Sequence, residues 1–308
     1  MLVSVIIPCY NVEDCVAEAV ASVAGQTYEK LEIICIDNNS TDNTWSILHQ
    51  LKQQYAHLII DKEMRPGANA ARNKGLAQAN GEWIQFLDAD DVLVNNKIEH
   101  QVQIVKDCKE DIAFITAAYK KRFIDGREQV IDHLSEEMYL GPFIHQAGIT
   151  SANLWATKWL KRVQGWDENL RSSQETELMF RLLLAGGKYL RDHQALTIVQ
   201  ERATGQISKS DPAPRWKRFV EVRLKYLDWL AVSNKLVLDK LGPRFHDFLL
   251  ATLIHLAGYD RDAAVDYYRK LSAYRWRTAN TFGINYYKNS LIKMLGFPFY
   301  LKLKSIFR

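Results

Sequence analysis

The sequence of 308 residues has few cysteines, no long apolar run and no large excess of either charge. Its four cysteines lack the spacing of metal ligands, and most lie in apolar runs, which is typical of packed, reduced thiols. No stretch approaches the ~20 consecutive apolar residues of a membrane-spanning helix, and no basic segment of a signal peptide precedes the first apolar run. These absences predict a cytoplasmic protein that is soluble or lies at the inner surface of a membrane.

The charges nearly balance over the whole chain but are unevenly distributed. The formal net charge of +4 at pH 7 is too small to indicate a nucleic-acid partner, and we expect none. No acidic residue follows Asp266, whereas nine lysines or arginines do. The basic character is therefore concentrated at the C-terminal end of the sequence.

A glycine-rich phosphate loop is also missing after the first apolar run. That run ends in Pro8-Cys9-Tyr10-Asn11-Val12-Glu13, which contains no Gly-x-Gly-x-x-Gly. Dinucleotide-binding proteins carry this pattern at the first strand-to-helix turn, because glycine lets the backbone approach the pyrophosphate. The sequence therefore argues against a dinucleotide-dependent oxidoreductase.

Strand and helix patterns alternate through the first part of the chain. Continuous β-branched runs indicate buried strands, and apolar side chains at helical spacing indicate helices between them. The expected strands are 2–7, 31–36, 58–60, 83–87 and 112–118, and the expected helices include 68–79 and 95–109. This alternation predicts an α/β fold with a doubly wound, mostly parallel sheet.

The pattern changes after residue 119. The Asp-Gly pair at 125–126 predicts a hairpin, and residues 149–156 and 175–185 read as a strand and a helix. Beyond the prolines at 212 and 214, helical patterns dominate, at 215–232, 245–256 and 262–271. We therefore expect a sheet-containing domain over residues 1–210 and a helical region over residues 211–308.

The most informative stretch is the expected strand at 83–87 with the residues that follow it. It ends in Asp88-Ala89-Asp90-Asp91, which places three carboxylates within four positions. Carboxylates this close repel one another, and a hard divalent cation that also binds phosphate oxygens would offset the repulsion. An acidic turn that serves capping and solubility is the alternative interpretation of this stretch taken alone.

Polar clusters also follow the other strands of the expected sheet. They are Pro8-Cys9-Tyr10-Asn11, Asp37-Asn38-Asn39-Ser40 and, near the start of a helix, Arg72-Asn73. Each has an ordinary explanation as a strand exit, a helix cap or a surface charge. Ligands of doubly wound sheets bind beyond the carboxyl ends of the strands, so the convergence of all these clusters on one edge predicts a ligand site there.

Taken together, these motifs resemble the family 2 glycosyltransferases, which have the A-type fold of nucleotide-diphospho-sugar transferases. The resemblance rests on the first strand with Pro8-Cys9-Tyr10-Asn11, on Ile36-Asp37-Asn38-Asn39-Ser40-Thr41-Asp42, on Gly67 with Ala71-Arg72-Asn73-Lys74-Gly75, and on Phe86-Leu87-Asp88-Ala89-Asp90-Asp91. Order and spacing match over about residues 1–205. The resemblance implies a nucleotide-sugar donor, a divalent metal (Mn²⁺ or Mg²⁺) and transfer with inversion at the anomeric carbon.

The resemblance also implies roles for the donor-binding residues. Pro8 and Tyr10 match the loop that packs on the nucleobase. Asp37 and Asn38 match a pair of acids that contacts the base, usually uracil, although the second acid is an amide here. An amide oxygen still accepts a hydrogen bond from a ring N–H, so a UDP-sugar is expected, with a dTDP- or GDP-sugar as the alternative.

Arg72 matches the basic residue near the base and the diphosphate, where its permanent charge and planar donors suit the task. Asp88 and Asp90 match the Asp-x-Asp motif, with Asp88 nearer the ribose and Asp90 as the metal ligand. Asp91 is expected to cap the next helix or to support the other two carboxylates without contacting the ligand itself. Arg202 is either part of a loop over the diphosphate or an ordinary surface cation.

A downstream cluster resembles the family's Gly-aromatic-Asp-Glu loop and the helix start that follows it. These are Gly165-Trp166-Asp167-Glu168 and then Gln174-Glu175, where the family usually has Glu-Asp. The resemblance places the catalytic base on Glu175, with Glu177 as its rival. A carboxylate that interacts with the N-terminus of a helix is the alternative interpretation.

The expected function is thus an inverting, metal-dependent glycosyltransferase of cell-surface polysaccharide or glycolipid synthesis, acting on a glycan or lipid-linked glycan. A non-catalytic nucleotide- or glycan-binding module of the same fold is the alternative from another class. The C-terminal segment interleaves aromatic and basic residues, such as Tyr286, Tyr287, Lys293, Phe299 and Lys302. It fits a helix in an anionic membrane interface and equally a tail packed on its own domain or on a partner subunit.

Overall fold

The computed structural model describes residues 1–202 and 211–306, and the chain divides into two compact units, Met1–Thr204 and Gly205–Arg308. The predicted boundary after residue 210 lies at the end of the segment 203–210, outside the described residues.

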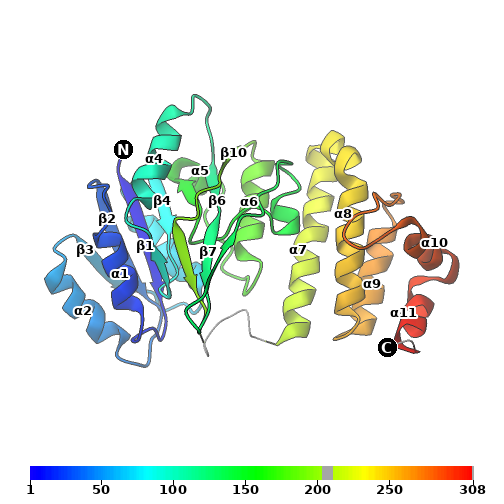
Figure 1. The fold of residues 1–308 in the computed structure, drawn as a ribbon, viewed down its shortest axis with the longest axis horizontal. Helices are drawn as coiled ribbons and strands as arrows, with labels where there is room; N and C mark the ends of the chain where they lie inside the picture. Colours follow the sequence, from blue (N-terminus) through cyan, green and yellow to red (C-terminus); the bar gives the residue numbers. More distant parts are fainter. Residues whose placement is uncertain (203–210, 307–308) are drawn as a thin grey trace. The chain divides into compact units, whose positions relative to one another are not determined.

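The first unit is an α/β structure built on a seven-stranded sheet with the strand order β10-β6-β9-β4-β1-β2-β3 (Figure 1). All of its neighbouring strands pair in parallel except β9, which is antiparallel to both β4 and β6. The strands are β1 (Val3–Cys9), β2 (Leu31–Asp37), β3 (Leu58–Lys62), β4 (Trp83–Phe86), β6 (Phe114–Ala117), β9 (Leu154–Ala156) and β10 (Tyr189–Asp192). The prediction of an α/β fold with a mostly parallel sheet is confirmed.

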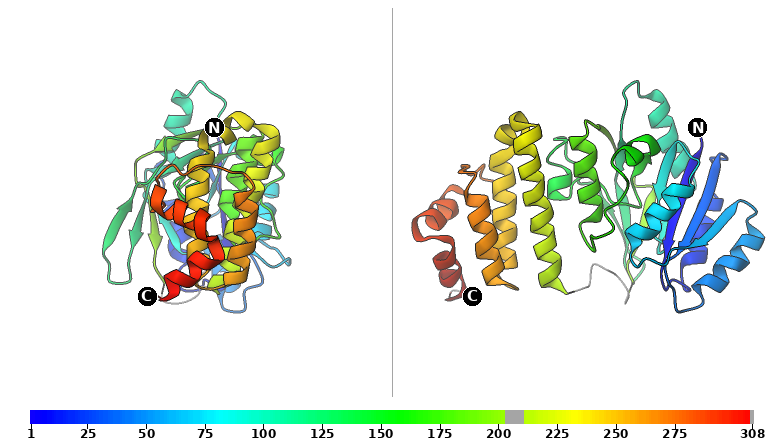
Figure 2. Two further views of the ribbon diagram at one scale, coloured as in Figure 1. Left: turned by 90° about the vertical axis from the view of Figure 1, so that its right-hand side faces the viewer. Right: turned by 180° about the vertical axis from the view of Figure 1, so that it is seen from behind.

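Helices cover both faces of this sheet. They are α1 (Val16–Ala24), α2 (Thr44–Gln54), α3 (Ala68–Gln78), α4 (Lys97–Asp107), α5 (Thr157–Arg162), α6 (Gln174–Leu184) and the short 3₁₀ helix η1 (Pro142–Ile144). The connections through α1 and α2 run along the sheet in one direction, and the connection from β3 through α3 to β4 runs in the other. Because such crossovers are right-handed, α3 covers the face opposite to α1 and α2 (Figure 2).

The core lies between the sheet and these helices. β1 forms because its β-branched residues are buried on both faces, and α1 buries Val16, Val20 and Val23 at helical spacing. The alanine-rich α3 packs very closely on β1, since a Cβ at Gly75 would lie 2.4 Å from Ile6 Cγ2. The cysteines are all free, as predicted, and Cys9 and Cys35 are buried in this core.

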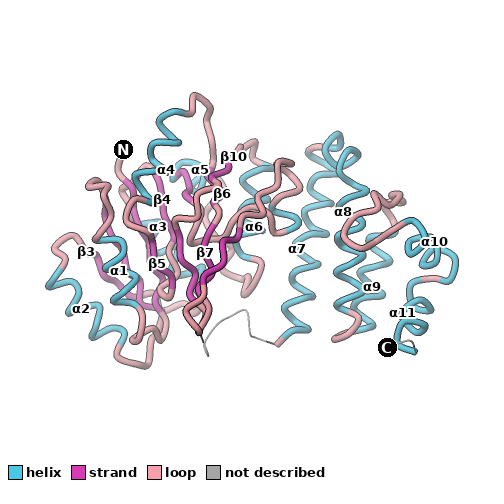
Figure 3. The backbone as a smooth tube through the Cα atoms, viewed as in Figure 1, coloured by secondary structure: helices cyan, strands magenta, loops and turns pink. Residues whose placement is uncertain are grey.

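A second sheet of four strands flanks the first, in the order β5-β11-β7-β8 (Figure 3). Its strands are β5 (Asp91–Leu93), β7 (Tyr119–Arg122), β8 (Glu128–Ile131) and β11 (Thr197–Gln200). The predicted hairpin is confirmed: β7 and β8 are antiparallel, and Gly126 closes the turn with a φ of 84°. β5 and β11, by contrast, were not predicted, and neither was β10 of the large sheet.

The second unit is helical, as expected. Its helices are α7 (Pro212–Ser233), α8 (Lys235–Leu256), α9 (Arg261–Ser272), α10 (Tyr286–Leu295) and α11 (Phe297–Ile306). Helix α8 begins ten residues before the predicted start at 245 and continues through Pro243. Across residues 1–202 and 211–306, none of the helices combines the length and the apolar character that a membrane crossing requires.

The expected strand at 149–156 is shorter than predicted, since only Leu154–Ala156 pairs with its neighbours. The preceding residues form a turn instead, in which the N–H groups of Ala152 and Asn153 both donate to the Ile149 carbonyl. The Asn153 side chain stabilises this turn through hydrogen bonds to the Ala117 N–H and the Ala147 carbonyl. These tertiary contacts override the local strand propensity.

Candidate active site

The carboxyl ends of β1, β2 and β4 meet at one edge of the large sheet, and the predicted donor residues lie there. Pro8 is still within β1, opposite Ile36, and Cys9 at the end of the strand pairs with Asp37 at the end of β2. Tyr10 follows directly, and its side chain is exposed by 60%. The geometry thus presents an aromatic ring to solvent beside a buried carboxylate.

The exit loops of β1 and β2 are joined by side-chain hydrogen bonds. The Asn11 N–H donates to Ser40 Oγ at 3.0 Å, and Asn11 Oδ1 accepts from the Thr41 N–H at 2.8 Å. Asn11 and Asn39 both have positive φ angles, 50° and 64°. Non-glycine residues in this region concentrate at functional sites, because the surrounding contacts must hold the strain.

Asp37 and Asn38 differ in how their side chains are used. Asp37 is 1% exposed, and its Oδ1 has no hydrogen-bond partner among the described residues. Asn38 is fully engaged: its amide donates to the carbonyls of Glu63 and Arg65, and its oxygen accepts from the Gly67 N–H at 2.7 Å. Asn38 therefore shapes the loop before α3, and its predicted contact with a base stays a prediction.

Arg72 lies at the centre of the site, buried in the second turn of α3. Its Nη2 donates to Asp88 Oδ1 at 2.7 Å, and its Nη1 donates to Gln174 Oε1 and Asn69 Oδ1, both at 3.0 Å. The guanidinium also lies over the Trp166 ring, 4.7 Å from its centre. One side chain thus connects the carboxylate turn after β4 with the start of α6.

The three carboxylates after β4 have different environments. Asp88 is partly exposed and pairs with Arg72. Asp90 is partly buried, and burial and the negative charge of Asp88 raise its pKa. Asp91 begins β5 and is buried, and burial together with the charges of Asp88 and Asp90 raises its pKa well above the usual value. Asp91 does not cap the next helix, which begins at Lys97.

Ser151, a residue that sequence reasoning missed, holds the turn that carries these carboxylates through hydrogen bonds. Ser151 Oγ accepts a hydrogen bond from the Asp88 N–H at 3.1 Å, and its hydroxyl also interacts with the Asp91 carboxylate. The Ser151 carbonyl accepts from Gln85 Nε2 at 2.8 Å. Gln85 in turn accepts a hydrogen bond from the ammonium group of Lys97. No local pattern marks Ser151, since it becomes part of the site only through the fold.

Glu175, the predicted base, stands in the first turn of α6, next to Gln174. Its side chain lines a cavity of about 160 Å³ together with Tyr119, His133, His145 and other residues of the region 117–149. Burial and the charges of Asp91 and Glu175 raise the pKa of Tyr119. Glu175 thus adjoins a space that is large enough for a small polar group.

The backbone around this cavity is strained in two places. Ser173, just before α6, and His145, just after η1, both have a φ of 58°. The rival base Glu177 is buried and forms a bidentate ion pair with Arg181, at 2.7 Å through both oxygens. Both Glu177 oxygens are therefore occupied by Arg181, and the assignment of the base to Glu175 stays a prediction.

A metal could be held only with help from a ligand. In the described part of the chain, no group of three or more His, Cys, Asp or Glu side chains could hold an ion on its own. Asp88 and Asp90 nevertheless form a close pair of carboxylates, and the charge of Arg202 opposes the rise in the pKa of Asp90. This donor set fits a hard cation that takes its remaining oxygens from a phosphorylated ligand.

Comparison with known proteins agrees with this geometry. The profile of the family described as "Glycosyl transferase family 2" matches residues 4–160, which is half of the chain and includes the strand-end motifs. The chain belongs to glycosyl transferase family 2. The family membership predicted from the motifs is therefore confirmed.

Among curated family 2 proteins, a UDP-Glc:α-D-GlcNAc-diphosphoundecaprenol β-1,3-glucosyltransferase of Escherichia coli is 37% identical over 123 residues, which are 40% of this chain and 49% of that protein. A poly(ribitol-phosphate) β-glucosyltransferase of Bacillus spizizenii is 36% identical over 131 residues, 41% of this chain and 20% of that protein. The chain spans about half the length, or less, of these relatives.

Solved structures show the same fold at low identity. The S. aureus TarS fragment 1–349 in complex with UDP-GlcNAc has a TM-score of 0.66 at 18% identity, over 89% of this chain and 92% of that one. A mannosyltransferase of Pyrobaculum calidifontis in complex with GDP-Man and Mn²⁺ has a TM-score of 0.60 at 16% identity, over 99% and 86%. The matched regions cover most of this chain, so the likeness includes part of the helical unit as well.

Proposed function

We propose that this family 2 protein is an inverting glycosyltransferase that moves a sugar from a UDP-sugar to a hydroxyl of a lipid-linked or polymeric cell-surface glycan. The observation that carries the proposal is the Arg72 junction. Its hydrogen bonds to Asp88 and Gln174 bring the donor-side turn to the residue next to Glu175. In this proposal one hydrogen-bonded network joins the leaving-group side of the site to the candidate base.

The base of the nucleotide would bind at the ends of β1 and β2. Asp37 Oδ1 is a buried acceptor without a partner in the described structure, which matches the ring N–H that uracil offers. The exposed Tyr10 ring suits stacking on the base. The UDP-GlcNAc complex of TarS and the UDP-Glc in the name of the E. coli relative support a UDP-sugar, whereas the GDP-Man complex keeps a GDP-sugar as the alternative.

The diphosphate would lie between the carboxylate turn and Arg72. When the glycosyl–phosphate bond breaks, negative charge develops on the diphosphate, and the positive charge of Arg72, which is held in place by Asp88, would stabilise it. Asp90, with Asp88 beside it, would hold the divalent metal. The ion would supply additional positive charge to the leaving group when bound.

The acceptor hydroxyl would enter the cavity beside Glu175. A hydroxyl is a poor nucleophile, so Glu175 would take its proton as it attacks the anomeric carbon. With one base in this position, a single displacement with inversion follows. Gln174 is occupied by Arg72 and by the Leu170 carbonyl, so its amide has a structural role and does not favour a non-catalytic module.

The test is transfer from UDP-glucose to a GlcNAc-diphospholipid acceptor, with Mn²⁺ present and UDP release as the readout. Glu175→Gln should lower turnover by about 10²–10⁴-fold while UDP binding, measured by thermal shift, stays at the wild-type level. Glu29→Gln is the matched control, because Glu29 is exposed before β2, at the opposite edge of the sheet. Full activity of Glu175→Gln would reject Glu175 as the base.

The nucleotide is tested separately by thermal shift with UDP, GDP, dTDP and CDP, each with Mn²⁺. A larger shift with UDP than with the others is expected, because at equal concentration the ligand that binds more tightly stabilises the folded state more. Asp37→Asn should weaken UDP about tenfold, the equivalent of ~1.4 kcal/mol. Preferential stabilisation by GDP would overturn the UDP assignment, and binding without turnover of any donor would favour the non-catalytic module.

A further inference from the structure

Exposed apolar side chains of the helical unit are concentrated on α10 and α11. On α10, Tyr287, Leu291 and Met294 are exposed by 82%, 39% and 75%. They follow one another at i, i+4 and i+7, so they form one stripe along the helix. Asn289 and Ile292 are buried on the other side. Helix α10 therefore packs on its own unit through one face and leaves the stripe of Tyr287, Leu291 and Met294 uncovered.

The charged residues of α10 and α11 themselves are all basic. Residues 267–308 contain no Asp or Glu and nine Lys or Arg. The exposed Lys293 lies between Leu291 and Met294 in the sequence. On α11, the exposed Phe299 is followed three residues later by the exposed Lys302. An apolar stripe on helices that carry basic but no acidic residues is typical of a segment that lies in the headgroup region of an anionic bilayer.

A second copy of this chain fits the same surface poorly. A two-fold interface brings identical patches together, so the cations of α10 and α11 would face each other, and neither helix carries an acidic residue to pair with them. Like charges at such contacts weaken association. The charge pattern therefore favours an extended anionic surface as the occupant.

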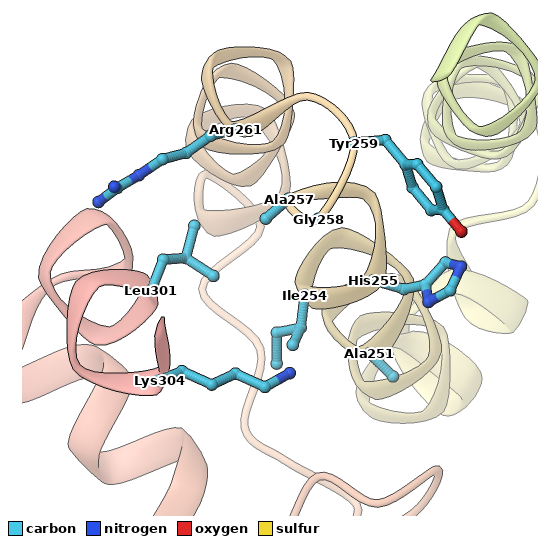
Figure 4. A pocket seen from close by; sticks show the side chains of 9 residues that line it. All are labelled: Ala251, Ile254, His255, Ala257, Gly258, Tyr259, Arg261, Leu301 and Lys304. Carbon is cyan, nitrogen blue, oxygen red and sulfur yellow. The ribbon is translucent and has the colours of Figure 1, made fainter. Parts of the chain in front are cut away.

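A cavity of about 550 Å³ in the same unit combines similar groups (Figure 4). Ile254 at the end of α8 and Leu301 on α11 supply apolar walls, and the Lys304 side chain extends across the space toward Ile254 (Figure 4). Arg261 lies at its edge, where its Nη2 donates to the Pro298 carbonyl at 2.8 Å and so ties α9 to the start of α11. An anionic headgroup with an attached hydrocarbon chain matches this combination of cation and apolar wall.

We propose that α10 and α11 dock on an anionic phospholipid bilayer, with Tyr287, Leu291, Met294 and Phe299 inserted at headgroup depth and with Lys293 and Lys302 against lipid phosphates. Docking goes beyond the proposed transfer reaction. It would keep the protein at the surface on which a lipid-linked acceptor is embedded.

The test is co-sedimentation of the full chain with vesicles of phosphatidylcholine alone and of phosphatidylcholine with 30% phosphatidylglycerol. Binding should favour the anionic vesicles and weaken as salt is raised. Leu291→Glu with Met294→Glu should lower the partition coefficient about tenfold or more. Leu236→Glu is the matched control, because Leu236 is 84% exposed in the first turn of α8, away from the stripe. It should bind as the wild type does.

A second variant separates lost insertion from lost folding. Lys293→Gln leaves the apolar stripe intact and should reduce binding to anionic vesicles severalfold without changing the circular dichroism spectrum. Equal binding of the stripe variant and the control would overturn the proposal, and so would equal binding to both vesicle types. A dimer in light scattering that Leu291→Glu with Met294→Glu dissociates, without any vesicle binding, would assign the stripe to self-association instead.

The result is independent of the chemistry at Glu175. UDP release from UDP-glucose in the absence of vesicles should be the same for the stripe variant and the wild type. Loss of vesicle binding with unchanged UDP release supports the docking surface whatever the acceptor is, whereas a failed transfer assay with normal vesicle binding counts only against the proposed function.

Discussion

Lys97 allows a quantitative test of the support beneath the carboxylate turn, and the test needs no ligand. Lys97 begins α4 and is 1% exposed, and its ammonium group donates to Gln85 Oε1. Burial lowers the pKa of Lys97 to about 7, while the negative charge of Asp192 acts in the opposite direction. In the unfolded chain the pKa of a lysine is about 10.4.

The sign of the pH dependence follows from these two values. Between about pH 7 and pH 10 the unfolded state binds more protons at this position than the folded state does. The free energy of unfolding should therefore increase as the pH rises through this window. Linkage with the two pKa values gives an increase of about 2 kcal/mol between pH 7 and pH 9 from Lys97 alone.

Lys97→Met removes the titrating group and keeps a chain of similar length in the core. The measurement is urea unfolding of both proteins, followed by tryptophan fluorescence at pH 7, 8 and 9. The difference between them should shift by ~2 kcal/mol in favour of the wild type over this range. The absolute stability of the variant at pH 7 also reflects the lost hydrogen bond to Gln85, so the change with pH is the decisive quantity.

Lys106→Met is the matched control, since Lys106 lies in the last turn of the same helix and is exposed. Its stability should run parallel to that of the wild type at all three pH values. If the difference between Lys97→Met and the wild type is constant from pH 7 to pH 9, Lys97 is held charged, and the reasoning from burial is refuted.

Three further predictions concern the site and its packing. Arg72→Lys keeps the positive charge, but one ammonium group cannot reach Asp88 and Gln174 together. UDP affinity measured by calorimetry should therefore fall about tenfold. Unchanged affinity would show that UDP binding does not need the Arg72 hydrogen bonds to both residues. Gly75→Ala places a Cβ 2.4 Å from Ile6 Cγ2, and the free energy of unfolding should drop by about 1–3 kcal/mol in urea titrations; wild-type stability would mean that α3 moves off β1 without penalty. EDTA should abolish UDP release from UDP-glucose, and added Mn²⁺ should restore it. The protein's carboxylates supply only part of the ion's coordination, so a chelator should remove the ion. Activity in EDTA would argue against a metal.

The central strands and the strand-end motifs were predictable because their signals are local. The β-branched run of β1 and the carboxylates after β4 are contiguous in the sequence, and parallel topology alone brings their ends to one edge. The Asp-Gly turn before β8 likewise contains its own signal. Such elements need no knowledge of distant partners.

The elements that were missed depend on distant partners. β5 and β11 are three and four residues long, and β11 pairs with β5 only because Val199 meets Asp91 in the folded chain. Ser151 hydrogen-bonds to the Asp88 turn from a segment whose sequence predicts a strand. Tyr119 and Glu175 come together only in the folded chain, where both line the same cavity. Short strands and long-range hydrogen bonds leave no periodic pattern, so sequence reasoning could not find them.

The four-stranded sheet has a consequence for how this protein can diverge or be engineered. Because β11 pairs with β5 on one side and with β7 on the other, the strand that starts at Asp91 and the strand that carries Tyr119 are hydrogen-bonded to the same neighbour. A chimaera that exchanges residues 119–131 for those of a relative would therefore also alter the backbone next to Asp90. Successful grafts of this region should therefore transfer β5, β7, β8 and β11 as one block.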